Sequence, residues 1–250
     1  LGLRLRTGKK EGILFIDEIN CVSETLAPTM LQFLQNKTFG SHSVPEGWLI
    51  AAAGNPPEYN KSVREFDIVT LDRVRRMDIE ADLEVWMEYA WKKEIHGSIL
   101  AYLGMKKDHF YSVENTVDGK FFVTARGWED LSEILKAYEK LGVEITENLI
   151  GEYLCRDEIA RSFLASYQLY RKYGEDYGLK RLLSGEMAEE EQQKKVKMAE
   201  GASFEERFLV TGLLLSGLNG SFLDYEKLDK ETGAVYQELL HLKAFLHDKK

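Results

Sequence analysis

Two adjacent carboxylates, Asp17 and Glu18, come directly after a short apolar run and could together serve a metal-bound phosphate. The run, residues 12–16, reads Gly-Ile-Leu-Phe-Ile, which is typical of a strand covered on both faces of a parallel sheet. Ligands of such sheets bind beyond the carboxyl ends of the strands, where both acids stand. Strands that bind nothing can end in the same way, so the assignment depends on whether later segments of the chain add matching groups.

A polar amide follows a second apolar run. Residues 48–53 read Trp-Leu-Ile-Ala-Ala-Ala and lead into Gly54 and Asn55. Two parallel strands joined by a helix-sized segment form a βαβ unit, so we expect Asn55 beside Asp17 and Glu18 at one edge of the sheet. The amide could donate to a phosphate oxygen or hold an attacking water, whereas the simpler alternative is a turn before two prolines.

Arginines occur in two further segments. Arg73, Arg75 and Arg76 lie close together, and a guanidinium group matches phosphate oxygens bidentately. A solvated basic turn is the alternative. Arg126 falls in the first turn of a helix that Thr124 would cap, and a cation at that position favours a nearby anion. Arg126 is therefore a candidate phosphate ligand.

In this order, the four segments resemble the motifs of AAA+ ATPases, and of the MoxR-like branch in particular. Residues 13–20 resemble the Walker B strand, 48–59 the sensor 1 strand and its loop, 71–76 the segment of the arginine finger, and 124–131 the sensor 2 helix. Four ordered motifs are far more specific than any one of them. The resemblance extends over most of residues 10–170.

The resemblance implies a role for each matching polar residue of the two strand ends. Asp17 would hold Mg²⁺, mostly through water, and Glu18 would orient and polarise the water that attacks ATP. Asn55 would be sensor 1, in contact with the γ-phosphate. The cofactors implied are therefore ATP and Mg²⁺.

The same resemblance assigns the arginines. Arg73 best matches the finger that reaches the nucleotide of an adjacent subunit, with Arg75 and Arg76 as alternatives. Arg126 would be sensor 2, which couples the position of the lid to the γ-phosphate. Ala125 stands where the family often has proline at the first helical position. Without proline the start of the helix is less preorganised, but no reactive group is lost.

The phosphate-binding loop of the family, Gly-x-x-x-x-Gly-Lys-Ser/Thr, has no match in this sequence. It should precede the Walker B segment, and residues 7–10, Thr-Gly-Lys-Lys, have one glycine and no Ser or Thr after the lysines. We expect the chain to be the carboxyl-terminal part of a longer ATPase and not a degenerate one, because the site residues named above are all kept. By itself the chain is expected to be inactive.

Composition limits the function classes. With 250 residues and 44% apolar residues, the chain can build two compact cores. Cys21 and Cys155 are too few for a disulfide framework or a zinc site, and no apolar stretch approaches the length of a membrane span. The formal net charge of -9 disfavours a nucleic-acid motor. We expect a cytoplasmic protein with neither nucleic acid nor membrane as a partner.

The expected fold class is α/β. Residues 1–81 would form an incomplete P-loop AAA+ core, residues 82–178 an all-helical lid, and residues 179–250 a helical extension. Residues 36–47 would be either a hairpin that touches substrate or an ordinary exposed turn.

Apolar spacing predicts the helices of the lid and the extension. Asp82 would cap one helix that carries apolar residues from Trp86 to Leu103, and a second would run from Ala125 until Gly142 stops it. The aromatic residues on these helices are expected to pack in a core and not to form an adenine pocket. The extension would hold two apolar helical segments, over residues 204–218 and 234–245.

The resemblance also implies a function for the complete protein, which would couple ATP hydrolysis to the remodelling or maturation of a protein client. A ring oligomer, usually a hexamer, is implied because a finger arginine works across a subunit boundary. MoxR-like proteins often act with proteins that carry a von Willebrand factor A domain, so such a partner is implied too. The alternative is a nonhydrolysing interaction scaffold of AAA+-like shape.

Overall fold

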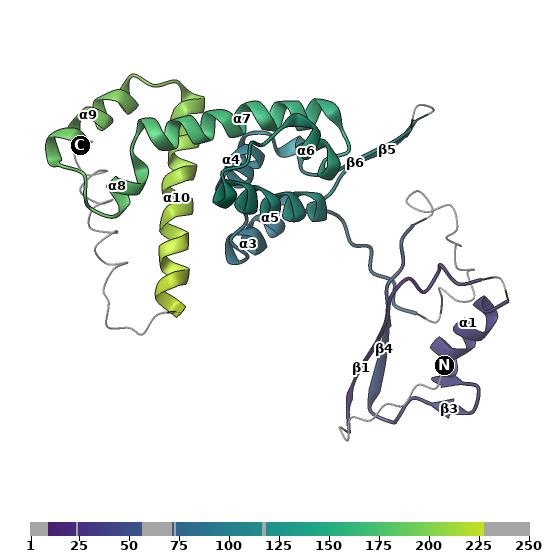
Figure 1. Ribbon diagram of the computed structural model, residues 1–250. Helices are drawn as coiled ribbons and strands as arrows, with labels where there is room; N and C mark the ends of the chain where they lie inside the picture. Colours follow the sequence, from purple (N-terminus) through teal and green to yellow (C-terminus); the bar gives the residue numbers. More distant parts are fainter. Residues whose placement is uncertain (1–9, 24, 57–71, 73, 117–118, 228–250) are drawn as a thin grey trace. The chain divides into compact units, whose positions relative to one another are not determined.

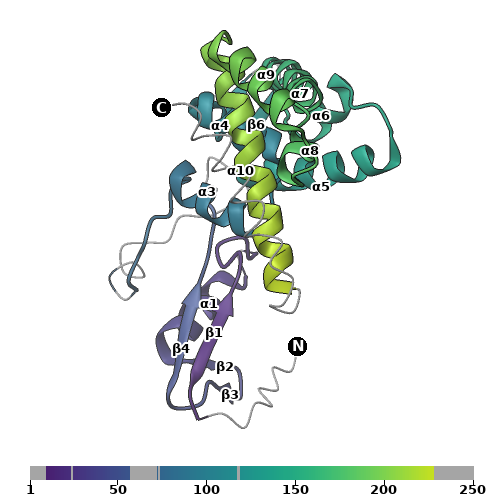
Figure 2. The same cartoon turned by 90° about the vertical axis from the view of Figure 1, so that its left-hand side faces the viewer.

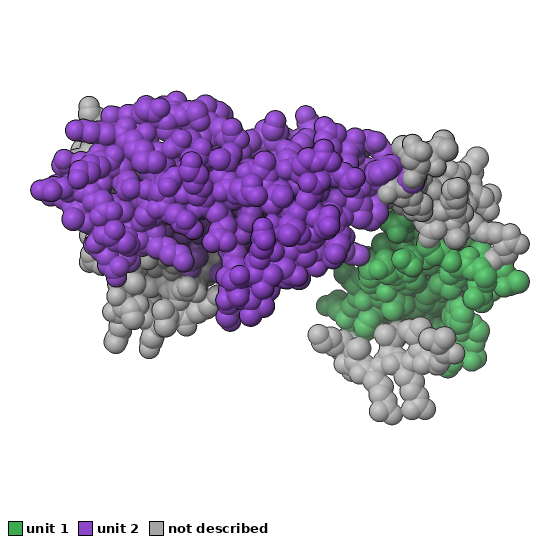
Figure 3. Space-filling model, turned by 45° about the horizontal axis from the view of Figure 1, so that its top comes forward, with its two compact units in different colours: residues 1–79 green, residues 80–250 purple. Residues whose placement is uncertain are grey.

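The computed structural model describes residues 10–23, 25–56, 72, 74–116 and 119–227 (Figure 1). The chain forms two compact units, unit 1 (residues 1–79) and unit 2 (residues 80–250), which Figure 3 colours separately. This division falls close to the boundary expected after residue 81. Unit 2 includes both the expected lid and the expected extension.

Unit 1 is built on a parallel pair of strands. Strands β1 (Gly12–Ile16) and β4 (Trp48–Ala52) run in register from Gly12 opposite Trp48 to Ile16 opposite Ala52. Helix α1 (Ala27–Asn36) lies between them in the chain and on one side of the sheet in Figures 1 and 2. The parallel pairing expected from the two apolar runs is confirmed.

A short hairpin follows α1. Strands β2 (Thr38–Phe39) and β3 (His42–Ser43) pair antiparallel, so this segment is a hairpin and not an unpaired turn. Gly40 has a φ of +59°, the left-handed conformation that a two-residue hairpin loop requires. The ring of Phe39 meets that of Phe33 edge to face at 6.0 Å, which anchors the hairpin to α1.

One face of the β1–β4 sheet is open. Ile13, Phe15 and Leu49 are 66%, 62% and 61% exposed, and the register puts Ile13 directly opposite Leu49. The expectation of strands covered on both faces was therefore wrong for this face. Continuous apolar residues predict that a strand can be covered, but they do not specify which element covers it.

Unit 2 begins with two helices in place of the single one expected. Helix α3 (Leu83–Lys92) is capped by Asp82, whose carboxylate accepts from the Val85 N–H at 3.0 Å. The chain then breaks at Glu94, whose φ is +55°, and α4 (Gly97–Met105) follows. The single helix was wrong because the His96 side chain caps a new one: its Nδ1 accepts from the Ser98 N–H at 3.2 Å.

The expected lid is not all-helical. After the short helix η1 (Lys107–His109), strands β5 (Ser112–Thr116) and β6 (Gly119–Val123) pair antiparallel. The sequence signal for this hairpin is the turn-forming dipeptide Asp-Gly at 118–119, with β-branched residues before it and aromatic residues after it. The helical interpretation overlooked that signal.

Six further helices follow in the described part of unit 2. They are α5 (Ala125–Leu141), α6 (Glu147–Tyr153), α7 (Asp157–Asp176), α8 (Leu179–Leu183), α9 (Glu189–Glu200) and α10 (Phe204–Lys227). The predicted ends of α5 are confirmed, because the Thr124 side chain accepts from the Gly127 N–H and Gly142 has a φ of +68°. The helix expected over 234–245 lies outside the described residues. Within the described part of the chain, no helix has the length and apolarity to cross a membrane.

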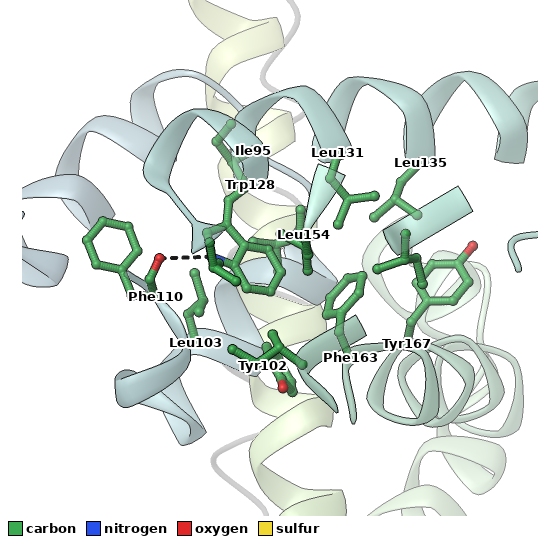
Figure 4. Packing of buried hydrophobic residues seen from close by; sticks show 14 of the residues in the cluster. Ile95, Tyr102, Leu103, Phe110, Trp128, Leu131, Leu135, Leu154, Phe163 and Tyr167 are labelled. Carbon is green, nitrogen blue, oxygen red and sulfur yellow. Dashed lines mark hydrogen bonds between the residues drawn. The ribbon is translucent and has the colours of Figure 1, made fainter. Parts of the chain in front are cut away.

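Aromatic residues form the centre of the unit 2 core (Figure 4). Trp128 is fully buried, and its indole N–H donates to the Phe110 carbonyl at 3.1 Å. Its ring meets that of Phe163 edge to face, with the ring centroids 5.4 Å apart, and its centroid lies 5.8 Å from that of the Tyr102 ring. The expectation that the aromatic residues pack in a core is confirmed.

Two leucines of α5 test this core. Leu135 is fully buried, whereas Leu141 at the end of the same helix is 73% exposed. Leu135→Ala should lower the free energy of unfolding of unit 2 by about 2–5 kcal/mol, because it leaves a cavity. Leu141→Ala should change it by less than about 0.5 kcal/mol. Denaturant titration followed by circular dichroism measures both, and equal effects would contradict the packing described.

A partly buried histidine, His109, is expected to make the stability of unit 2 depend on pH. The Tyr102 hydroxyl and Nδ1 of His109 are 2.6 Å apart. Burial lowers the pKa of His109 below its ordinary value, and Lys106 lowers it further. The protonated imidazole is therefore disfavoured in the folded state more than in the unfolded state.

We expect unit 2 to keep its full stability above about pH 6.5, the pKa of an unfolded histidine, and to lose stability as pH falls through the lower folded pKa. His109→Asn keeps an acceptor for Tyr102 but does not titrate, so its melting temperature should fall less between about pH 7.5 and pH 5.5. The variant His42→Asn, in exposed β3, is the control. An unchanged pH dependence in His109→Asn would contradict the prediction.

Candidate functional site

Backbone pairing continues beyond the carboxyl ends of β1 and β4. The Ala53 N–H donates to the Ile16 carbonyl at 2.8 Å, and the Ile19 N–H donates to the Ala53 carbonyl at 2.9 Å. Ile19 is only 4% exposed, so it anchors the turn that follows β1. These two bonds fix the loops after the two strands against each other.

The two carboxylates stand on that turn. Asp17 and Glu18 are both exposed, and Oδ1 of Asp17 accepts from the Glu18 N–H at 2.9 Å. Glu18 has a φ of +51°, a left-handed conformation that costs a residue with a side chain about 1–2 kcal/mol. Backbone strain of this kind clusters at functional sites. The turn therefore presents two acidic groups to solvent at the edge of the sheet.

Asn55, the residue expected to supply an amide at the same edge, lies on the loop after β4. Asn55 is exposed just beyond β4, and its backbone carbonyl accepts a hydrogen bond at 2.8 Å from the side-chain amide of Asn20. The structure thus brings the loop of Asp17 and Glu18 together with the loop of Asn55. Asn20 belongs to the segment 13–20 that resembles the Walker B strand, but no role was inferred for it from the sequence.

Of the four candidate arginines, the described residues include Arg75, Arg76 and Arg126. Arg73 lies outside the described residues. Arg75 is exposed, and Arg76 pairs with Asp78 at 2.8 Å in an ion pair so exposed that it contributes little stability. Arg126 is exposed in the first turn of α5, in unit 2, whereas the two carboxylates and Asn55 belong to unit 1.

The donor set at the strand ends suits a weakly held, hydrated cation. Within the described residues no group of three His, Cys, Asp or Glu side chains is placed to hold a metal ion. Asp17 and Glu18 supply oxygen ligands, which Mg²⁺ prefers, and Mg²⁺ commonly takes its other ligands from water and phosphate. The strand ends thus present two exposed carboxylates, and any further ligands of a cation there would have to come from water or from a bound molecule.

Unit 2 holds a second cluster of titratable groups, around Glu139. Its carboxylate accepts from Nε2 of His96 at 3.1 Å and from the Tyr167 hydroxyl at 2.9 Å. Burial alone would raise the pKa of Glu139, but these hydrogen bonds outweigh it and hold the pKa below its ordinary value. Burial and the neighbouring Glu139 raise the pKa of Tyr167 to about 12.

This cluster ties the N-cap of α4 to helices α5 and α7. Nδ1 of His96 accepts from the Ser98 N–H, so the neutral ring carries its proton on Nε2 and donates it to Glu139. The Ser98 hydroxyl lies 2.7 Å from Nδ1, an approach seen in nucleophilic serines. Ser98 is only 1% exposed, however, which denies it a substrate.

Comparison with protein-family models, with curated proteins and with solved structures found no match. The geometry of the strand ends is therefore the basis of the functional proposal.

The strain at Glu18 can be tested on the carboxylate turn itself. Glu18→Gly and Glu18→Ala both remove the carboxylate, but only glycine adopts a positive φ without steric cost. Glu18→Gly should therefore leave unit 1 more stable than Glu18→Ala by about 0.5–1 kcal/mol. Hydrogen exchange of the β1 and β4 amides measures the difference, and an alanine variant at least as stable as the glycine variant would contradict it.

Proposed function

We propose that this chain is part of an ATPase that resembles the MoxR-like AAA+ proteins, and that Asp17, Glu18 and Asn55 act on Mg-ATP. The single observation that carries the proposal is that hydrogen bonds join the two polar loops that follow β1 and β4, at the carboxyl ends of this parallel strand pair. Acidic and amide groups at this edge suit phosphoryl transfer, in which catalysis consists almost entirely of positioning and electrostatic stabilisation.

Each residue has a distinct chemical task in this proposal. Asp17 would hold Mg²⁺ through water, and its bond to the Glu18 N–H would keep its carboxylate oriented. Glu18 would orient and polarise the attacking water as its general base, because its carboxylate is exposed next to Asp17. Asn55 would donate its side-chain amide to the γ-phosphate oxygen or to that water.

The remaining parts of the proposal rest on the resemblance alone. Arg73, or in its place Arg75 or Arg76, would reach the nucleotide of an adjacent subunit in a ring, usually a hexamer. Arg126 would respond to the γ-phosphate from unit 2. The energy of hydrolysis would remodel a protein client, in company with a protein that carries a von Willebrand factor A domain.

Glu18→Gln tests the proposal most directly, in the protein expressed with whatever sequence precedes Leu1 in its gene. Glutamine keeps the shape of the side chain but cannot accept the proton, so hydrolysis should fall roughly 100-fold or more while ATP still binds. Phosphate release and calorimetric titration measure the two effects. Glu11→Gln is the control, because Glu11 is exposed at the opposite end of β1. Hydrolysis at the wild-type rate in Glu18→Gln would refute the assignment.

A further inference from the structure

We propose that Asn20 is a positioning residue, which holds Asn55 in register with the carboxylate turn of Asp17 and Glu18. The inference rests on the proposed function and adds to it a residue that touches neither nucleotide nor metal. Asn20 lies in the turn after β1, and its side-chain amide donates to the backbone carbonyl of Asn55 at 2.8 Å. This bond adds a further link beyond the two backbone bonds that connect the strand ends.

The space around Gly54 shows that the two loops are built to meet at Asn20. A Cβ atom placed on Gly54 would lie 2.4 Å from Oδ1 of Asn20 and 2.8 Å from its Cγ. Real Cβ atoms do not approach other atoms so closely, so any side chain at position 54 would push the Asn20 amide aside. Glycine at this position leaves room for the close approach of that amide.

The amide is held at some energetic cost. Oδ1 of Asn20 is buried and has no hydrogen-bond partner within the described structure. A buried acceptor without a partner costs about 1–3 kcal/mol. Turning the amide over would satisfy Oδ1 no better and would bring it against the Asn55 carbonyl, so the Nδ2 donor must face Asn55.

This cost distinguishes positioning from simple stabilisation. The Asn55 residue is exposed, so its carbonyl could bond to water if Asn20 were replaced. An apolar residue of similar size at position 20 would also remove the unsatisfied Oδ1. Stability alone therefore does not require asparagine, whereas the bond that ties the Asn55 backbone to the carboxylate turn does require a donor at position 20.

The main test is Asn20→Leu in the protein expressed with whatever sequence precedes Leu1 in its gene. We expect the melting temperature to stay equal or rise, because no buried acceptor remains without a partner. We expect kcat for ATP hydrolysis to fall roughly 10- to 100-fold, because a misplaced group loses its orientation. The KM for ATP should stay within about twofold, since Asn20 does not touch the nucleotide.

Two further variants keep the test independent of any one substitution. Gly54→Ala displaces the Asn20 amide without altering it, so it should lower kcat in the same way. Ser23→Ala is the matched control, because Ser23 lies on the same loop and its hydroxyl meets that of exposed Thr25, away from Asn55. Its kcat should equal that of the wild type.

Hydrogen exchange in the present chain tests the contact without any enzymatic activity. In Asn20→Leu the amides of Ile19 and Ala53, whose hydrogen bonds join the two loops, should exchange roughly tenfold faster, while those in the middle of β4 keep their rates. Two results would overturn the role of Asn20 and leave the proposed function standing. One is unchanged exchange in Asn20→Leu, and the other is an unchanged kcat in Asn20→Leu when Glu18→Gln does abolish hydrolysis. If the wild type shows no ATP hydrolysis, the proposed function fails, and the positioning role fails with it.

Discussion

The parallel pairing of β1 with β4 is the constraint on which the candidate site depends. Because both strands run in the same direction, both of the loops that follow them leave from one edge of the sheet. Two backbone bonds then extend the pairing past the strand ends, and a buried isoleucine anchors the turn. An antiparallel pair would have sent the acids and the amide to opposite edges.

Much of this arrangement could be predicted from local sequence. The apolar runs predicted β1 and β4, and the segment of helical length between them predicted parallel pairing. The helix caps could also be predicted, because Asp82 and Thr124 come just before residues with apolar helical spacing and Gly142 comes just after them. Each of these signals acts within a few residues, which is why the sequence displays it.

What the sequence did not reveal depends on contacts between distant residues. The break before α4 comes from a histidine that acts as a cap, and the same ring is held by Glu139 from another helix. The open face of the β1–β4 sheet could not be foreseen, because periodicity reports that a strand can be covered and not what covers it. The bond from Asn20 to Asn55 joins residues that are 35 positions apart, so no local pattern contains it.

Local energetic costs fall together on the turn after β1. Within three residues this turn holds a glutamate at positive φ, Glu18, and an asparagine with an unsatisfied buried oxygen, Asn20. The Glu139 cluster of unit 2, by contrast, satisfies its carboxylate with two donors and keeps it half-buried. Unit 2 also has a residue at positive φ, Glu94, and an unsatisfied buried hydroxyl, that of Ser166, but these lie in separate segments. Natural proteins break local rules chiefly at functional sites, so two such costs within one turn support the strand ends of unit 1 as the proposed place of chemistry.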